Sequence, residues 1–269
     1  MIEPKAKKQL ILVAIACWLL AIPLQGSLNR YKIYRETSTK AITDVSEGGT
    51  LAMVAMLGGF RNITANILWL KSDEYWHQGG SGWWRMLPML RTIVALDPHF
   101  IDAWDVLGWH CAWNLHSDAP ESEKPLWIEN GINYYRQGIR ENPKRYELYS
   151  SLAWLYHDRL RDYNKAIPIW KKVCSFKDAP VTQKHMLAHC YERTWQVDKA
   201  VAVWKEALRD KKGDNPVAKS AIEWWAKHHD DRAYLISLWQ RENRLRLGRG
   251  LPPVASPDGK IPAPVQEAK

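Results

Sequence analysis

His185 and His189 lie four residues apart, with Cys190 directly after the second, so a helix would present both imidazoles on one face. Imidazole and thiolate are ligands that Zn²⁺ prefers in proteins. A zinc-protease helix also carries an acidic residue between its histidines and is followed by a third ligand. Neither is apparent here, so we interpret His185 and His189 as solvated surface histidines.

Other catalytic patterns are also missing from the sequence. The residues His228-His229 and Asp230-Asp231 are most simply a polar turn between helices. The chain has no glycine-rich phosphate loop and no c-type haem motif, and no serine stands in a nucleophile elbow. We therefore expect a protein that is not an enzyme, with no cofactor, no metal ion and no small-molecule substrate. An enzyme built on a histidine cluster is the third hypothesis, and no complete motif supports it.

A second set of residues is suited to binding a protein. Exposed tryptophans are typical of interface hot spots, and carboxylates beside them would attract a basic segment. The predicted partner-binding groove consists of Asp102, Asp105, Trp109, Trp113, Glu147, Trp154, His157, Asp158, His185, His189 and Arg193. Its tryptophans could instead be covered by the chain's own apolar segment 50–60 or by a neighbouring subunit.

These residues must be positioned by helices, which are most clearly predicted at Asp97–Ala112. The segment opens with Asp-Pro, and its Trp104, Leu107, Gly108 and Cys111 fall on one helical face. Gly108 costs about 1 kcal/mol of helix propensity relative to Ala, so its presence indicates a close approach by a neighbouring helix.

The same spacing recurs along the chain, first in Tyr149, Leu152, Ala153 and Tyr156 and then in Leu187, Ala188 and Tyr191. Second helices show a small-x3-aromatic-x2-small pattern, and the three matches are Gly131, Tyr135, Gly138; Ala166, Trp170, Val173; and Ala200, Trp204, Ala207. The whole pattern resembles the tetratricopeptide repeat (TPR), a helix-turn-helix unit of about 34 residues.

The TPR resemblance implies an all-α fold in which the first helices line a concave face that binds extended peptides or partner helices. We predict a TPR-like α-solenoid of about four to five helix pairs over residues 66–247. Its terminal pairs, about Asn66–His77 with Trp83–Leu96 and Pro216–His228 with Asp231–Leu247, are degenerate. The residues expected at the packing positions are Trp104, Leu107, Gly108, Ala153, Tyr156, Ala188, Tyr191, Ala200, Trp204 and Ala207.

An N-terminal apolar run, Leu10–Leu24, follows three lysines. With its flanks it predicts a single transmembrane helix over residues 9–28, after a short cytoplasmic stub. A cleaved signal peptide is the alternative, but Ile22–Gly26 is a poor cleavage site. A lipoprotein that uses Cys17 fails because the apolar run continues past it. We expect a single-pass protein of the cytoplasmic (inner) membrane, with the repeats outside the cytoplasm.

Between the anchor and the repeats we predict a connector over residues 29–65, which includes an apolar helix over 50–60. This helix could pack on the first repeat pair or lie at the membrane surface. The run from Leu57 to Trp69 is similar to the start of many uncharacterised bacterial membrane-anchored TPR proteins. At the other end, residues 248–269 are rich in proline and predict an extended tail, which is either a partner-binding arm or a disordered end.

The net charge of +9 is unevenly placed, because residues 1–40 hold seven Lys or Arg and two acids, whereas residues 41–212 hold 22 and 20. The repeats have no sustained basic stripe, so nucleic-acid binding is unsupported. Of the four cysteines, Cys174 and Cys190 could be neighbours and pair, although small buried apolar residues are the simpler interpretation.

These features favour a non-enzymatic, membrane-anchored scaffold. It would be anchored in the bilayer through residues 9–28. At the extracytoplasmic face it would bind a protein partner or a multi-subunit membrane or envelope complex. The alternative is a TPR peptide-binding chaperone or assembly factor for a secreted or cofactor-bearing protein.

Overall fold

The structure is a computed structural model that describes residues 60–211 and 213–259. The predicted span at 9–28 and most of the predicted connector and its apolar helix lie outside the described residues, as do residues 260–269. Among the helices that are described, none is both long and apolar enough to cross a membrane.

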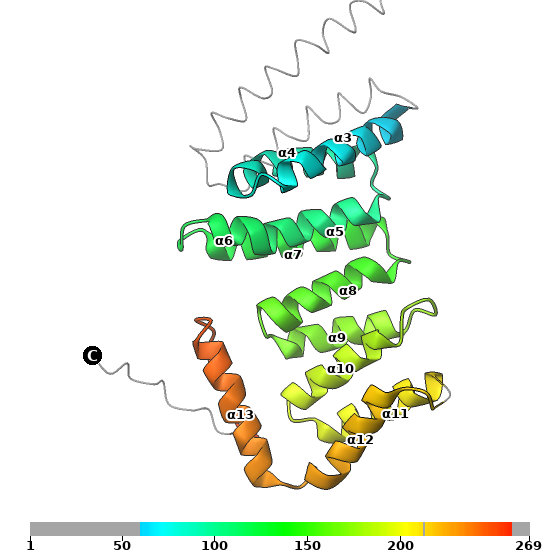
Figure 1. The fold of residues 1–269 in the computed structure, drawn as a ribbon, viewed down its shortest axis with the longest axis vertical. Helices are drawn as coiled ribbons and strands as arrows, with labels where there is room; N and C mark the ends of the chain where they lie inside the picture. The colour runs from blue at the N-terminus through cyan, green and yellow to red at the C-terminus, as the bar shows by residue number, and fades with distance from the viewer. Residues whose placement is uncertain (1–59, 212, 260–269) are drawn as a thin grey trace, which may run out of the picture. The chain divides into compact units, whose positions relative to one another are not determined.

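Helices form the regular structure of the described residues, and they follow one another in pairs (Figure 1). In chain order they are α3 (Arg61–Trp76), α4 (Gly80–Leu96), α5 (Ile101–Trp109), η2 (His110–Leu115), α6 (His116–Asp118), α7 (Lys124–Glu141), α8 (Tyr146–Trp154), η3 (Leu155–Arg159), α9 (Tyr163–Cys174), α10 (Thr182–Arg193), α11 (Val197–Asp210), α12 (Pro216–His228) and α13 (Arg232–Leu247).

The first helix pair begins earlier than the sequence predicts. Helix α3 starts at Arg61, so residues 61–65 belong to a helix and not to the connector. This extra turn carries Ala65, which is fully buried, and that burial favours its inclusion in the helix. The turn after α3 is also tighter than expected, because Gly79 takes a φ of 65° and α4 begins at the next residue.

Three glycines set the closest approaches between helices. A Cβ on Gly108 of α5 would lie 2.7 Å from ring atoms of Tyr135 on α7. A Cβ on Gly131 would lie 2.8 Å from the carbonyl oxygen of Gly108, and one on Gly138 would lie 2.8 Å from the ring of Trp104. Helices α5 and α7 therefore pack nearly backbone to backbone, which only glycine permits at these positions.

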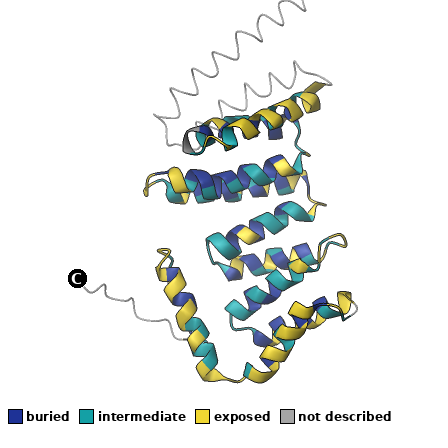
Figure 2. Cartoon of the chain, viewed as in Figure 1, coloured by how far each residue is buried: buried dark blue, intermediate teal, exposed yellow. Residues whose placement is uncertain are grey.

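All the residues expected at packing positions are buried, and those that carry a side chain have 6% or less of their surface exposed. In Figure 2 the layer of α5 and α7 is mostly buried, whereas α3 and α13 carry many exposed residues. The continuous apolar core therefore runs through the contacts between successive helix pairs, as in other repeat arrays.

Two first helices end in π-helical turns, which the sequence analysis did not predict. Segment η2 continues α5, and η3 continues α8. In η2 the fully buried His110 contacts the carbonyl oxygen of Trp83 through Nε2 at 2.8 Å, and its Nδ1 lies 3.2 Å from Asn114 Nδ2. This arrangement ties η2 to the preceding helix pair and leaves no free histidine nitrogen there.

Two turns inside helix pairs repeat the same geometry. Arg161 and Trp195 take left-handed φ values of 49° and 61°. The amide that follows each of them donates back to a buried tyrosine carbonyl, from Asp162 to Tyr156 at 2.8 Å and from Gln196 to Tyr191 at 2.9 Å. Both turns therefore place a residue with a large side chain in the left-handed conformation, which glycine or asparagine adopts at lower energetic cost.

The last two helices differ from the predicted repeat unit. Helices α12 and α13 are present close to the expected bounds, but they diverge in a V and do not lie side by side as a hairpin (Figure 1). Instead α13 turns back toward the turn that joins η3 to α9. The last predicted pair is therefore open. Tyr234 keeps the start of α13 against Trp224 of α12, whereas polar side chains farther along α13 bind the earlier units.

Candidate functional site

A pocket of about 410 Å³ opens where five helices of three successive pairs meet. It is lined by Asp105, Trp109, Tyr135, Ser150, Ser151, Trp154, Trp170, Thr182, Gln183 and Met186, a set that we call the groove. The first helices α5, α8 and α10 contribute most of these residues, as the TPR resemblance implies for a binding face.

The apolar walls of the groove are two tryptophans on neighbouring first helices. Trp154 of α8 is 41% exposed, a large value for an indole. Trp109 of α5 is half-buried, because it stacks on Trp113 at 5.8 Å and lies 5.5 Å from Trp76 of α3. The aromatic surface thus extends from the groove along η2 to the end of α3, and it offers a wide face for an apolar partner.

The acidic group of the groove is Asp105. Burial raises the pKa of its carboxyl group, and hydrogen bonds from Ser151 and Tyr135 oppose that rise. The nearby Asp102 raises the pKa further through repulsion between like charges. The raised pKa means that ionising Asp105 costs free energy in the empty groove. A cationic group from a partner would offset that cost, since an opposite charge favours the ionised carboxylate.

The floor of the groove includes an indole whose N–H is not satisfied. Trp170 is 1% exposed, and its Nε1 has no hydrogen-bond partner among the described residues. A buried donor without a partner costs about 1–3 kcal/mol. An acceptor brought by a bound segment would recover part of that cost if it reached this nitrogen.

Polar contacts close the groove on the α10 side. Ser150 Oγ on α8 donates to Gln183 Oε1 on α10 at 2.9 Å. His157 of η3 stacks on Trp154 at 5.5 Å, and its Nδ1 lies 3.2 Å from Cys190 Sγ on α10. Burial, together with the positive charges of His189 and Arg193, lowers the pKa of His157 to about 4, so the ring is neutral near pH 7.

The structure brings three of the predicted groove residues to the pocket, namely Asp105, Trp109 and Trp154. Trp113 and His157 stand behind them as stacking partners. Asp102 is exposed on α5 and does not line the pocket. The predicted acidic edge is therefore a single carboxylate and not a row.

Five other predicted residues have different roles. Glu147 pairs with its neighbour Arg145, and the carbonyl oxygen of Asp158 accepts a hydrogen bond from Arg249. The remaining three are His185, which contacts Asn215, His189, which pairs with Glu192, and Arg193, which pairs with Glu242. They lie outside the pocket because they face α12, the array's own second helices or α13.

Several groove residues were missed by the sequence analysis. They are Tyr135, Ser150, Ser151, Trp170, Thr182, Gln183 and Met186. Tyr135 and Trp170 carry a signal, since both are the aromatic of a second-helix pattern, but that pattern predicts packing alone. The others are small polar or flexible residues whose types indicate no particular role.

The histidines and cysteines give no metal site in the part of the chain that the structure describes. Cys111, Cys174 and Cys190 are free thiols, so the pairing of Cys174 with Cys190 that the sequence left open does not occur. Burial raises the pKa of Cys190 to about 12 and that of Cys174 to about 11, which keeps both thiols protonated and unreactive near neutral pH.

Solved structures that are similar to this chain include the two given below. No protein-family model matches the chain, and no curated protein does. The MamA protein is 22% identical, with a TM-score of 0.42, over 64% of this chain and 86% of MamA. TTC0263, a thermophilic TPR protein in Thermus thermophilus, is 20% identical, with a TM-score of 0.41, over 65% of this chain and 98% of its own.

The predicted repeat fold is confirmed by the helix pairs themselves. Their small residues at the close approaches and their buried aromatic partners stand where the TPR pattern requires them. The part of the chain that the structure describes is therefore a TPR-like array of helical repeats.

Proposed function

We propose that this chain is a non-enzymatic scaffold that binds a protein partner in the groove. The observation that carries the proposal is the pairing of two accessible indoles, Trp109 and Trp154, with the half-buried carboxyl group of Asp105 in one pocket. Aromatic walls bury apolar side chains, and a desolvated acid favours a cation, so the groove suits an apolar segment that carries Lys or Arg.

The proposal also includes attachment to the cytoplasmic membrane through residues 9–28, with the repeats on the extracytoplasmic side. What supports it is the lysine-flanked apolar run described above. Alkaline carbonate extraction tests the anchor, since an anchored chain stays in the membrane pellet. Protease added to intact spheroplasts tests the orientation, because only an extracytoplasmic repeat region is digested without lysis.

The partner can be identified by crosslinking from inside the groove. A photo-reactive amino acid at Met186, which lines the pocket on α10, should join to partner peptides that contain Lys or Arg within an apolar run. The matched control places the same amino acid at Val217, which is 53% exposed on α12 away from the groove. Equal crosslinking from both positions, or peptides without a basic residue, would contradict the proposal.

The form of the complex separates the scaffold from the chaperone alternative. A scaffold should recover its partner folded and in a fixed ratio after purification from detergent. A chaperone should instead capture many unfolded chains transiently and release them as they fold.

A further inference from the structure

Helix α13 and the segment after it form one body, residues 232–256, which we call the C-terminal arm. The indole nitrogen of Trp239 donates to the carbonyl oxygen of Val254 at 2.9 Å. The backbone amide of Val254 donates in turn to Asn243 Oδ1 at 2.9 Å. The predicted extended tail is thus folded back along α13 as far as it is described, and the two move together.

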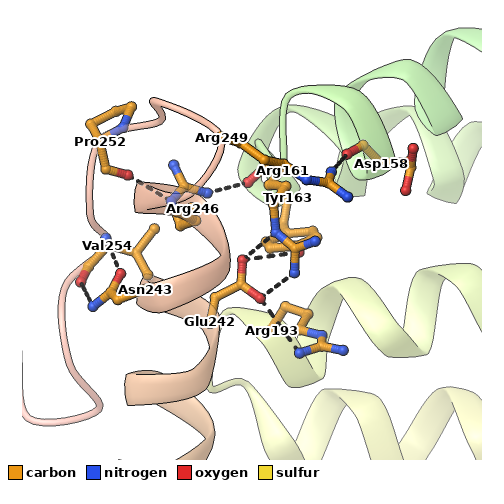
Figure 3. A network of polar contacts seen from close by, with 10 residues as sticks. All are labelled: Asp158, Arg161, Tyr163, Arg193, Glu242, Asn243, Arg246, Arg249, Pro252 and Val254. Carbon is orange, nitrogen blue, oxygen red and sulfur yellow. Dashed lines mark hydrogen bonds and ion pairs between the residues drawn. The ribbon is translucent and has the colours of Figure 1, made fainter.

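The arm is held by a buried carboxylate (Figure 3). The side chain of Glu242 is fully buried and accepts from Arg161 Nε at 2.6 Å and from Arg161 Nη2. It also accepts from the hydroxyl group of Tyr163 at 3.2 Å and from Arg193 Nη1 at 3.5 Å. A paired, hydrogen-bonded carboxylate of this kind is stable while its cations remain in place.

These contacts join two successive helix pairs. Arg161 lies in the turn between η3 and α9, and Tyr163 begins α9, so both belong to the α8–α9 pair. Arg193 ends α10, which belongs to the next pair. A second tie reaches the α10–α11 turn, where Trp195 Nε1 donates to the carbonyl oxygen of Ala255 at 3.2 Å. The arm therefore bridges the two left-handed turns described above.

The arm also contributes two arginines of its own, which bind backbone carbonyl groups of the α8–α9 pair. Arg246 Nη1 donates to the carbonyl oxygen of Arg161 at 2.6 Å, and Arg249 Nη1 donates to that of Asp158 at 2.8 Å. Asp158 lies in η3, directly continuous with the part of α8 that carries Trp154. The arm thus holds the end of a groove helix by its main chain.

The arm is nevertheless not packed tightly on the array. A cavity of about 570 Å³ lies between them, lined by residues 160–165 and 193–196 on the array and by Arg246, Pro252, Val254 and Ala255 on the arm. Few apolar contacts are lost when such an element detaches, so polar ties decide whether it stays closed. The arm joins α12 through residues 229–231, and its Tyr234 accepts a hydrogen bond from Trp224 of α12 at 3.1 Å, so this end of the arm would act as the hinge.

The same two helix pairs supply two adjacent walls of the groove. Ser150, Ser151 and Trp154 come from α8, and Thr182, Gln183 and Met186 come from α10. The distance between these walls depends on how the α8–α9 pair is rotated against the α10–α11 pair, because each repeat unit contacts only its neighbours. An element that ties both pairs at their turns fixes that rotation.

We propose that the C-terminal arm is a latch that sets the geometry of the groove. With Glu242 bound to Arg161 and Arg193, the α8–α9 and α10–α11 pairs are held at one angle and the groove keeps its walls in place. When the arm opens about its hinge, the two pairs rotate more freely and the groove loosens. This inference gives the groove of the proposed function a means of regulation, but its test requires no partner.

The test is hydrogen–deuterium exchange of the full chain in detergent, read by mass spectrometry. Glu242→Gln keeps the shape of the side chain and removes its charge. We expect the amides of α13, and those of residues 150–158 and 182–190, to exchange at least tenfold faster, while α4 to α7 stay unchanged. The matched control is Glu223→Gln, which alters an exposed glutamate of α12 and should change none of these rates.

A second variant separates the two ion pairs of Glu242, one with Arg161 and one with Arg193. Arg193→Gln leaves the Arg161–Glu242 pair intact, so α13 should remain protected while residues 182–190 exchange faster. The proposal is overturned if Glu242→Gln frees α13 without changing α8 and α10, since the arm would then be a passive cover. It is also overturned if α13 stays protected in Glu242→Gln, or if Arg193→Gln leaves α10 unchanged. Should Glu242→Gln fail to fold, Arg193→Gln decides alone, because Arg193 is on the surface side of the cluster.

Discussion

Arg161 and Glu242 stand 81 positions apart in the chain, yet the guanidinium group of one holds the carboxylate of the other through two hydrogen bonds. Burial acts to raise the pKa of Glu242, and the bonds and charge of Arg161 outweigh it, so the pKa lies below its usual value. Glu242 is therefore charged at neutral pH. A charged carboxylate is tolerated at this buried position only while Arg161 remains beside it.

Removing Arg161 should release the C-terminal arm. We choose Arg161→Asn because asparagine tolerates the left-handed φ of 49° at this turn, so backbone strain does not confuse the result. Breaking a buried ion pair costs about 3–5 kcal/mol, which corresponds to an opening that is at least a hundredfold more frequent. Limited chymotrypsin digestion should cut the arm at Tyr234 or Trp239 at a correspondingly higher rate.

The control for this experiment is Arg145→Asn, which breaks the exposed pair with Glu147. Surface pairs contribute about 0–1 kcal/mol, so its digestion rate should stay close to that of the parent. Equal rates in both variants would show that the arm is not held by the Arg161–Glu242 pair.

Gly108 should tolerate no side chain. Alanine favours a helix over glycine by about 1 kcal/mol, so Gly108→Ala would stabilise an exposed helix. At this position the added Cβ meets the ring of the buried Tyr135 at 2.7 Å, and we expect a net loss of about 1–3 kcal/mol from overpacking. Thermal unfolding followed by circular dichroism should show a lower melting temperature.

The matched substitution is Gly248→Ala at the end of α13. Its Cβ would have no atom closer than 3.4 Å and its φ is −63°, so the melting temperature should change little. A Gly108→Ala protein as stable as its parent would contradict the close packing of α5 on α7.

His157 should make the repeat region sensitive to acid. Burial first, and then the charges of His189 and Arg193, lower its pKa from 6.5 to about 4. The folded chain therefore holds fewer protons than the unfolded chain between these values. The resulting stability is fully present above pH 6.5 and is lost as the pH falls toward 4, by at most about 3 kcal/mol.

Urea unfolding at pH 7 and pH 4.5 measures this loss. In His157→Gln the difference between the two pH values should be smaller than in the parent. His77→Gln is the control, because His77 forms only an exposed contact with Asp73 and should leave the pH dependence as it is. If His157→Gln keeps the parental dependence, another group causes it.

The groove tryptophans should carry much of the binding energy for a partner segment. Once the crosslinked segment is known, Trp109→Ala together with Trp154→Ala should weaken its binding by about 2 kcal/mol or more, or roughly 30-fold, without unfolding the array. Isothermal titration calorimetry with the synthetic segment measures the change. The control Val217→Ala changes an apolar side chain that is 53% exposed on α12, and it should bind as the parent does.

Asp105 should act mainly on the rate of association. Asp105→Asn removes the charge and keeps the size of the side chain in its contacts with Ser151 and Tyr135. We expect slower association with a basic segment in stopped-flow measurements, and a difference from the parent that shrinks as salt is raised. A salt-independent difference would indicate lost hydrogen bonding and not lost attraction.

The repeat architecture could be predicted from the sequence because its signal is local. Trp104, Leu107 and Gly108 recur in type and spacing, and each set lies within one helix or between a helix and its neighbour. Such contacts follow from the 3.6-residue period and the size of the side chains. The same local signal placed Trp109 and Trp154 off the packing faces, where the structure finds them in one pocket.

Contacts between distant parts of the chain were decided only by the tertiary structure. The apolar periodicity of α13 is weak compared with that of α9 and α11, and nothing in it indicates that Glu242 reaches Arg161. The V between α12 and α13, the π-helical turns and the rotation between successive pairs set which side chains meet. These features depend on the path of the whole backbone, so His189 and Arg193 face internal partners although their positions in the repeat place them on the binding face.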